Sequence, residues 1–129
     1  RRFPNERFLI VHYGDHQPGA TWSYLSEADH KAIRSGEWTE TQGSEAFITY
    51  FAVEGINYTP PPMPDYDTLD VPYVGTVMLE AARIPLSAAY QERQRLMDTC
   101  GGRYTTCPDR NQILAFHRRL IDSGIVSAR

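Results

Sequence analysis

FLIVHYGDHQP, residues 8–18, is the stretch that decides the predicted fold. Its first half is an apolar run of strand length, and the run stops at Gly14. Such a run, without polar alternation, is typical of a strand buried on both faces inside a parallel sheet. In open α/β sheets, ligand-binding groups lie just outside the carboxyl ends of such strands. The sequence therefore predicts a functional site at Asp15 and His16.

The bulk composition narrows the class of protein. The 129 residues suffice for one compact domain with its own core. The formal net charge of -3 and the lack of a basic run give no electrostatic basis for binding nucleic acid or an anionic membrane surface. The chain opens with Arg1-Arg2 rather than Met, so we expect it to be a piece of a longer protein.

A second strand is predicted over residues 46–53, because this stretch is rich in aromatic and β-branched residues and is followed by Gly55. Between the two strands, Ser26 with an acidic residue three positions later predicts the start of a short helix that ends near Gly36. Residues 57–67 contain four prolines, which favour an extended connector across the surface. A proline-rich ligand for a recognition domain is the alternative.

Three helices are predicted in the second half of the chain. The first starts near Asp67 or Asp70, has a proline in its first turn and is ended by Pro85. The second is capped by Ser87 and stops before two glycines. The third opens with Pro108 at its first helical position and stops at Gly124. Together these elements predict an α/β fold with few strands and about four helices.

Two strands are few for a freestanding sheet. We expect the sheet to continue into sequence outside this chain, or its unpaired edges to recruit a second copy and form a homo-oligomer.

Asp15 and His16 have the chemistry of metal ligands, because a carboxylate and an imidazole together suit a divalent transition metal. Adjacent strand residues point to opposite faces, so both can reach one site only if the chain bends, which Gly14 permits. His12 and Glu54 are weaker candidates for further ligands; a core histidine and a strand-end turn are their plainer interpretations. The plain alternative for Asp15 and His16 is a turn with an exposed histidine.

The two cysteines, Cys100 and Cys107, enclose a short loop that contains glycine. They form either a disulfide, which indicates an oxidising compartment, or two free thiols near helix ends. Their spacing is too wide for a zinc knuckle, and no second pair exists in the sequence.

In its context, the stretch 8–18 resembles the last metal-binding strand of the sulfatase and alkaline phosphatase superfamily. That superfamily includes sulfatases, phosphoglycerol and phosphoethanolamine transferases, and lipoteichoic acid synthase-like enzymes. The order of a strand with FITYF, residues 47–51, a connector, and LDVPYVGT, residues 69–76, is similar to the C-terminal tails of bacterial sulfatase-like membrane proteins. The resemblance covers nearly the whole chain.

The resemblance implies that residues 1–129 form one C-terminal segment of a sulfatase-like catalytic domain, with part of an alkaline phosphatase-like sheet. Asp15 and His16 would then bind a divalent metal, which could be Zn, Mn, Ca or Mg. The parent enzyme would hydrolyse or transfer sulfate or phosphate esters, on small or lipid-linked substrates, in the periplasm of a bacterial inner-membrane protein. A disulfide between Cys100 and Cys107 would agree with that location.

The chain departs from the family in one respect, since it lacks a match to the family's Ser, Thr or formylglycine nucleophile. Cys100 and Cys107 do not have the sulfatase Cys-x-Pro-x-Arg context. We therefore expect this chain alone to be inactive. A small protein-interaction domain is the alternative, and a complete small metallohydrolase using Asp15, His16, His12 and Glu54 is a weaker third hypothesis.

Overall fold

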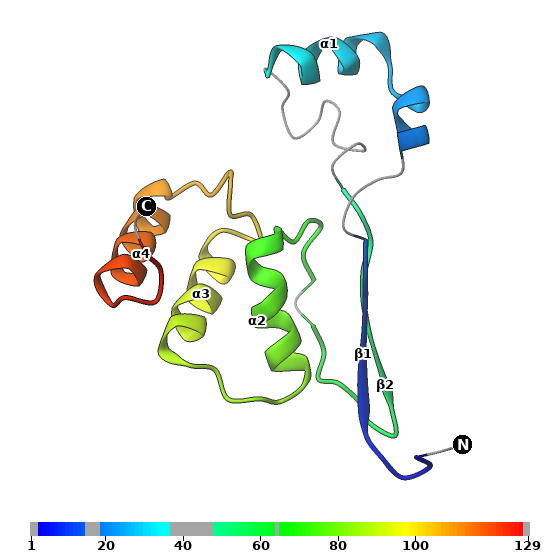
Figure 1. Ribbon diagram of the computed structural model, residues 1–129, viewed down its shortest axis with the longest axis vertical. Coiled ribbons are helices and arrows are strands. Elements are labelled where there is room, and N and C mark those ends of the chain that lie inside the picture. The colour runs from blue at the N-terminus through cyan, green and yellow to red at the C-terminus, as the bar shows by residue number, and fades with distance from the viewer. Residues whose placement is uncertain (1–2, 15–18, 37–47, 64, 128–129) are drawn as a thin grey trace. The chain divides into compact units, whose positions relative to one another are not determined.

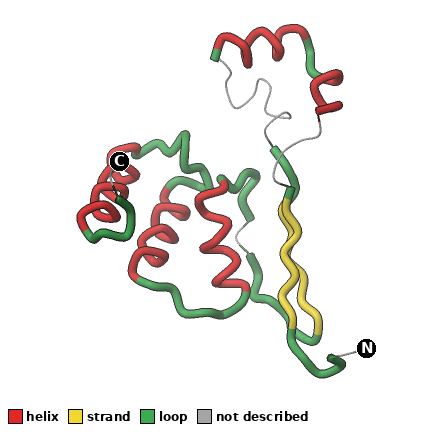
Figure 2. Tube along the Cα trace, viewed as in Figure 1, coloured by secondary structure: helices red, strands yellow, loops and turns green. Residues whose placement is uncertain are grey.

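A computed structural model describes residues 3–14, 19–36, 48–63 and 65–127. Within these residues the fold is mixed α/β, with four α-helices and a two-stranded antiparallel sheet (Figures 1 and 2). The chain divides into two compact units. One comprises Ile10–Glu54, and the other comprises Arg1–Leu9 together with Gly55–Arg129.

Strand β1 spans Phe8–Tyr13, as the apolar run predicts, and pairs with β2, Phe51–Ile56. The prediction of a parallel neighbour is wrong for this pair, which is antiparallel. The strand is also not buried on both faces, because each of its residues is exposed or half-buried. Burial on both faces requires a layer against each face, and the apolar composition of a strand does not say which segment supplies those layers.

Strand β2 lies further along the chain than predicted. Residues 48–50 are not strand, residues 46 and 47 lie outside the described residues, and the strand continues through Gly55. A Cβ atom on Gly55 would stand 1.9 Å from the carbonyl oxygen of Tyr58. The glycine is thus required by the chain folding back after the strand, and it does not end the strand.

In the unit Ile10–Glu54, helix α1 spans Glu27–Ser35 and follows a short 3-10 helix at Gly19–Tyr24. The predicted capping box is confirmed: the Ser26 hydroxyl accepts from the Asp29 amide at 3.1 Å, and the Asp29 carboxylate accepts from the Ser26 amide at 3.1 Å. Gly36 ends the helix with a φ of 70°. No residue of α1 is buried, so local capping rather than packing explains where this helix begins and ends.

The second unit contains helices α2, Val71–Ala81, α3, Ala88–Thr99, and α4, Arg110–Asp122. Asp70, Ser87 and Asp109 are their N-caps. Two predicted boundaries are wrong. Helix α2 ends at Ala81, before Pro85. Pro108 is not the first helical residue of α4, because the N-cap is Asp109, whose carboxylate accepts from the amide of Gln112 at 3.4 Å.

All buried side chains among the described residues belong to this second unit, between Tyr73 and Phe116. Helix α3 contacts both α2 and α4 and lies in the middle of this core. The buried residues with side chains are Tyr73, Thr76, Val77, Ala81, Leu96, Met97, Cys100, Cys107, Ile113 and Phe116.

The proline-rich segment is held against the helices of its own unit. The Tyr58 hydroxyl donates to the carbonyl oxygen of Ala81 at 2.7 Å, at the end of α2. The Tyr66 hydroxyl donates to the carboxylate of Asp98 at 2.9 Å, on α3. These two bonds favour the interpretation of the segment as a connector over that of a free proline-rich ligand.

Candidate functional site

The candidate metal site begins at Gly14, directly after β1. The Gly14 amide donates to the carbonyl oxygen of Tyr50 at 3.2 Å. A Cβ atom built on Gly14 would stand 2.0 Å from the Thr49 hydroxyl oxygen, so only glycine fits without a shift of this neighbour. The end of β1 therefore lies closely against the residues that lead into β2. The predicted ligands Asp15 and His16 follow in the sequence and lie outside the described residues.

The two weaker candidates for metal ligands, His12 and Glu54, lie on β1 and β2 and are both exposed. His12 is thus not the buried core histidine that its apolar surroundings in the sequence favour. Over the described ranges, no three His, Cys, Asp or Glu side chains gather closely enough to hold a metal ion.

The remaining two histidines pair with neighbouring groups. The ring of His30 lies edge-on to Trp22, and its Nε2 atom is 2.8 Å from the Trp22 carbonyl oxygen. His117 is exposed on α4, and its Nε2 atom forms a hydrogen bond with the Tyr104 hydroxyl. Both contacts give these rings a structural role.

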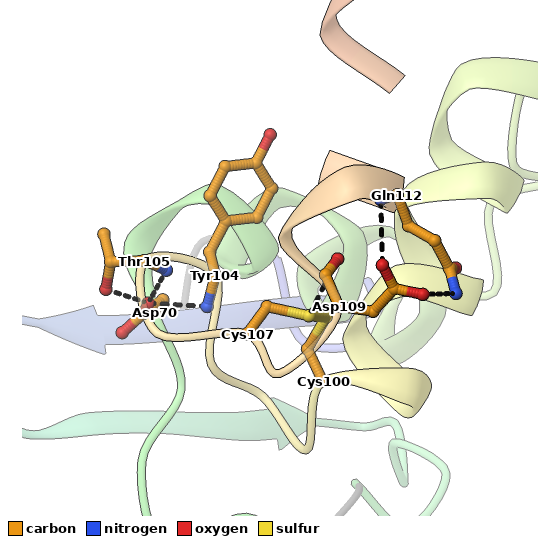
Figure 3. Close-up of a disulfide and its surroundings, with 7 residues drawn as sticks. All are labelled: Asp70, Cys100, Tyr104, Thr105, Cys107, Asp109 and Gln112. Atoms are coloured by element: carbon orange, nitrogen blue, oxygen red, sulfur yellow. Dashed lines mark hydrogen bonds between the residues drawn. A yellow bond between two sulfur atoms is a disulfide. The ribbon is translucent and has the colours of Figure 1, made fainter. Parts of the chain in front are cut away.

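The structure joins Cys100 and Cys107 in a disulfide, which closes the loop between α3 and α4 (Figure 3). The Asp70 carboxylate holds this loop, because its Oδ2 atom accepts from the amides of Tyr104 at 2.6 Å and Thr105 at 2.9 Å. It also accepts from the Thr105 hydroxyl at 2.9 Å. The start of α2 and the disulfide loop therefore form one connected structure.

Sequence reasoning missed the role of Asp70, because its loop partners lie more than thirty positions away. The sequence left a disulfide and two free thiols as open alternatives for Cys100 and Cys107, and the short spacing between the two cysteines was the available clue. The Oδ2 atom of Asp70 is occupied by backbone and hydroxyl donors of the loop, which is a structural use of this carboxylate.

Among the groups of the helical unit whose pKa values are raised are the buried Tyr73 and the half-buried Glu80. Burial, with smaller contributions from the nearby Tyr104 and Asp70, raises the pKa of Tyr73 to about 12. Burial also raises the pKa of the Glu80 carboxyl on α2, and the negative charge of Asp98 adds to this. The Tyr73 hydroxyl is buried and has no hydrogen-bond partner among the described residues.

Comparison with protein-family models, with curated proteins and with solved structures finds no match to this chain. None of the described helices is both long enough and apolar enough to cross a membrane.

Proposed function

We propose that this chain is the C-terminal segment of a sulfatase-like enzyme that hydrolyses or transfers sulfate or phosphate esters with the help of a divalent metal. Asp15 and His16 supply two of the metal ligands, and the nucleophile lies elsewhere in the parent enzyme. The parent is a bacterial inner-membrane protein whose catalytic domain lies in the periplasm. A disulfide such as Cys100–Cys107 is compatible with an oxidising compartment.

The observation that carries this proposal is the tight glycine junction at the end of β1. A carboxylate and an imidazole that follow a strand in sequence need a bend to reach one ion. Gly14 allows such a bend, and its amide is held by Tyr50 while its Cα lies against Thr49. These contacts fix the position of Gly14, which directly precedes Asp15 and His16 in the sequence.

The chemistry follows from the residue types. Asp15 offers oxygen and His16 offers nitrogen, a donor set that suits Zn²⁺ or Mn²⁺. A bound ion of this kind polarises a phosphoryl or sulfuryl oxygen and lowers the pKa of a hydroxyl nucleophile. In this chain the two side chains hold and orient the ion, and they leave coordination positions for ligands from the rest of the enzyme and for the ester.

Paramagnetic broadening by Mn²⁺ tests the proposed ligands. We expect sub-stoichiometric Mn²⁺ to broaden the amide resonances of Tyr13, Gly14 and Tyr50 selectively. Both Asp15→Ala and His16→Ala should abolish this selectivity. Asp122→Ala removes the same charge from the end of α4 and should leave the broadening unchanged.

Two results would contradict the assignment: broadening that survives Asp15→Ala, or micromolar binding that is indifferent to it. We also expect no turnover of p-nitrophenyl phosphate or p-nitrophenyl sulfate by this chain. Turnover by the purified chain would show that it contains its own nucleophile and would support a complete small metallohydrolase.

A second candidate function, a non-catalytic interaction domain, is favoured by the apolar side chains around the ends of the two strands. Tyr13, Ile48 and Tyr50 are 63%, 48% and 66% exposed. Exposed apolar groups of this size and unpaired strand edges both mark contact surfaces. This candidate predicts a chain that ignores metal and associates through its strands with a second copy; a monomer in light scattering at high concentration would count against that association.

A further inference from the structure

A groove lies between the proline-rich segment and helix α2, within the helical unit. Its volume is about 480 Å³, within the range of small-molecule sites. Five apolar side chains and a single carboxylate line it. These residues are Pro61, Pro62, Met63, Val77, Glu80 and Ala81.

The walls of the groove are held in place by side chains outside it. The Tyr58 hydroxyl bonds to the Ala81 carbonyl at one end of the proline-rich wall, and the Tyr66 hydroxyl bonds to Asp98 beyond the other end. Prolines have restricted backbone torsions, so this wall loses little further freedom when a ligand binds. The opposite wall is helix α2, in which Val77 and Ala81 are buried. The groove is therefore formed before any ligand arrives.

Glu80 gives the groove its only charge. Gln94 on α3 donates to its Oε1 atom. Its Oε2 atom has no hydrogen-bond partner, and no cation pairs with it, within the described part of the chain. The charged groups that act on Glu80 include Asp98, which is also acidic. A cation in the groove would relieve this repulsion.

We propose that this groove binds the primary ammonium group of a small, free aliphatic amine, with the ammonium at Glu80 and the carbon chain between Met63 and Val77. A guanidinium fits less well, because it prefers both oxygens of a carboxylate and Gln94 already occupies one. A quaternary ammonium fits less well because none of the six lining residues is aromatic. This inference does not depend on Asp15 or His16.

Titration of the full chain with n-pentylammonium, followed by NMR of the Val77 and Ala81 methyl groups, tests the proposal. We expect saturable shifts with a dissociation constant in the millimolar range, and none with pentanoate. Glu80→Gln should weaken binding by about fivefold or more, since it removes the charge and keeps the shape. Asp122→Asn removes an equal charge away from the groove and should leave the affinity within twofold.

A second variant keeps the test independent of any effect of Glu80→Gln on folding. Met63 is exposed on the groove wall, and Met63→Lys places an ammonium next to Glu80 that competes with the probe. We expect it to weaken n-pentylammonium binding without changing the spectrum of α4. Undiminished binding in Glu80→Gln, or equal shifts with pentanoate, would overturn the proposal. Much tighter binding of a lysine peptide with uncharged termini than of n-pentylammonium would also overturn the proposal, because the occupant would then be a protein side chain.

Discussion

The two units of this chain differ in where their apolar side chains lie. In the unit Gly55–Arg129 with Arg1–Leu9, Tyr73 and Phe116 are 0% and 1% exposed, and three helices share one core closed by a disulfide. In the unit Ile10–Glu54, no described residue is buried, and Tyr13 and Tyr50 stand exposed. The unit with the candidate metal ligands is thus the one whose described residues form no buried core.

This difference has a physical consequence. Burial of apolar area is the dominant favourable term in folding, so the helical unit is able to hold its shape through its own contacts. The unit Ile10–Glu54 obtains its local structure from the capping box of α1 and the ladder between the strands. Under the proposed function, this unit is expected to gain stability from a bound metal or from further chain.

The largest expected effect comes from emptying the helical core. Phe116→Ala removes a ring that is 1% exposed and should lower the free energy of unfolding by about 4 kcal/mol. Tyr13→Ala removes an aromatic ring from β1 in the unit Ile10–Glu54, where it is 63% exposed, and should cost less than about 1 kcal/mol. Urea unfolding of both variants measures this contrast, and equal losses would erase the distinction between the two regions.

The next effect comes from opening the disulfide loop. The double variant Cys100→Ala with Cys107→Ala removes a cross-link with a sequence separation of 7. Chain-entropy reasoning predicts a loss of about 2.5 kcal/mol for a loop of this size. Urea unfolding measures this loss of stability. The amide chemical shifts of the double variant should change in the loop that Asp70 holds and stay unchanged in α1. Shifts spread over α1 would show that the two regions are not independent.

A smaller and opposite effect is expected at Tyr73. Its hydroxyl is buried without a partner among the described residues, and an unsatisfied buried polar group costs free energy. Tyr73→Phe removes that group and keeps the ring that packs edge-on to Tyr104, so the protein should be stabilised by about 1 kcal/mol. Tyr50→Phe, at a position 66% exposed, is the matched control and should be neutral in thermal unfolding. A destabilised Tyr73→Phe would reveal a hydrogen bond at this hydroxyl.

The smallest effect concerns the ionisation of Tyr73, which changes stability only at alkaline pH. The pKa of Tyr73 is raised from 10.0 to about 12 in the folded state, mainly by burial. Between these two values the unfolded chain has lost the proton and the folded one has kept it, so stability must fall as the pH rises through this window. Unfolding free energies measured from pH 9 to pH 12 should show the decline in the wild type and less of it in Tyr73→Phe. If the unfolding free energy fell equally steeply with pH in both proteins, groups other than Tyr73 would cause the decline.

Local chemistry explains what the sequence could predict. The bounds of β1, the capping box at Ser26 and the cap at Ser87 depend on residues a few positions apart, and they were predicted correctly, while Asp70 was one of two predicted starts for α2. The antiparallel partner of β1 and the position of β2 depend on long-range pairing, and these were predicted wrongly. Gly55 looked like a strand end because glycine serves both as a terminator and at close backbone approaches.

The candidate site and the groove show the same difference between features that depend on nearby residues and features that depend on distant ones. Gly14 was predicted to permit a bend, and its contact with Thr49 shows why a side chain does not fit there. The groove at Glu80 was not predicted, because its lining residues come from a proline-rich connector and a helix that looked unrelated in sequence. The metal ligands Asp15 and His16 stay a prediction that the Mn²⁺ experiment tests.

Native-state hydrogen exchange tests the contrast between the two regions most directly. We predict that the slowest amides of α2, α3 and α4 exchange only through unfolding of the whole helical unit, with one shared opening free energy. The amides of α1, and those of β1 from Ile10 onward, should exchange at a much lower opening free energy. Protection of these amides equal to that of the helical core would contradict the account, because the unit Ile10–Glu54 would then be as stable as the helical unit.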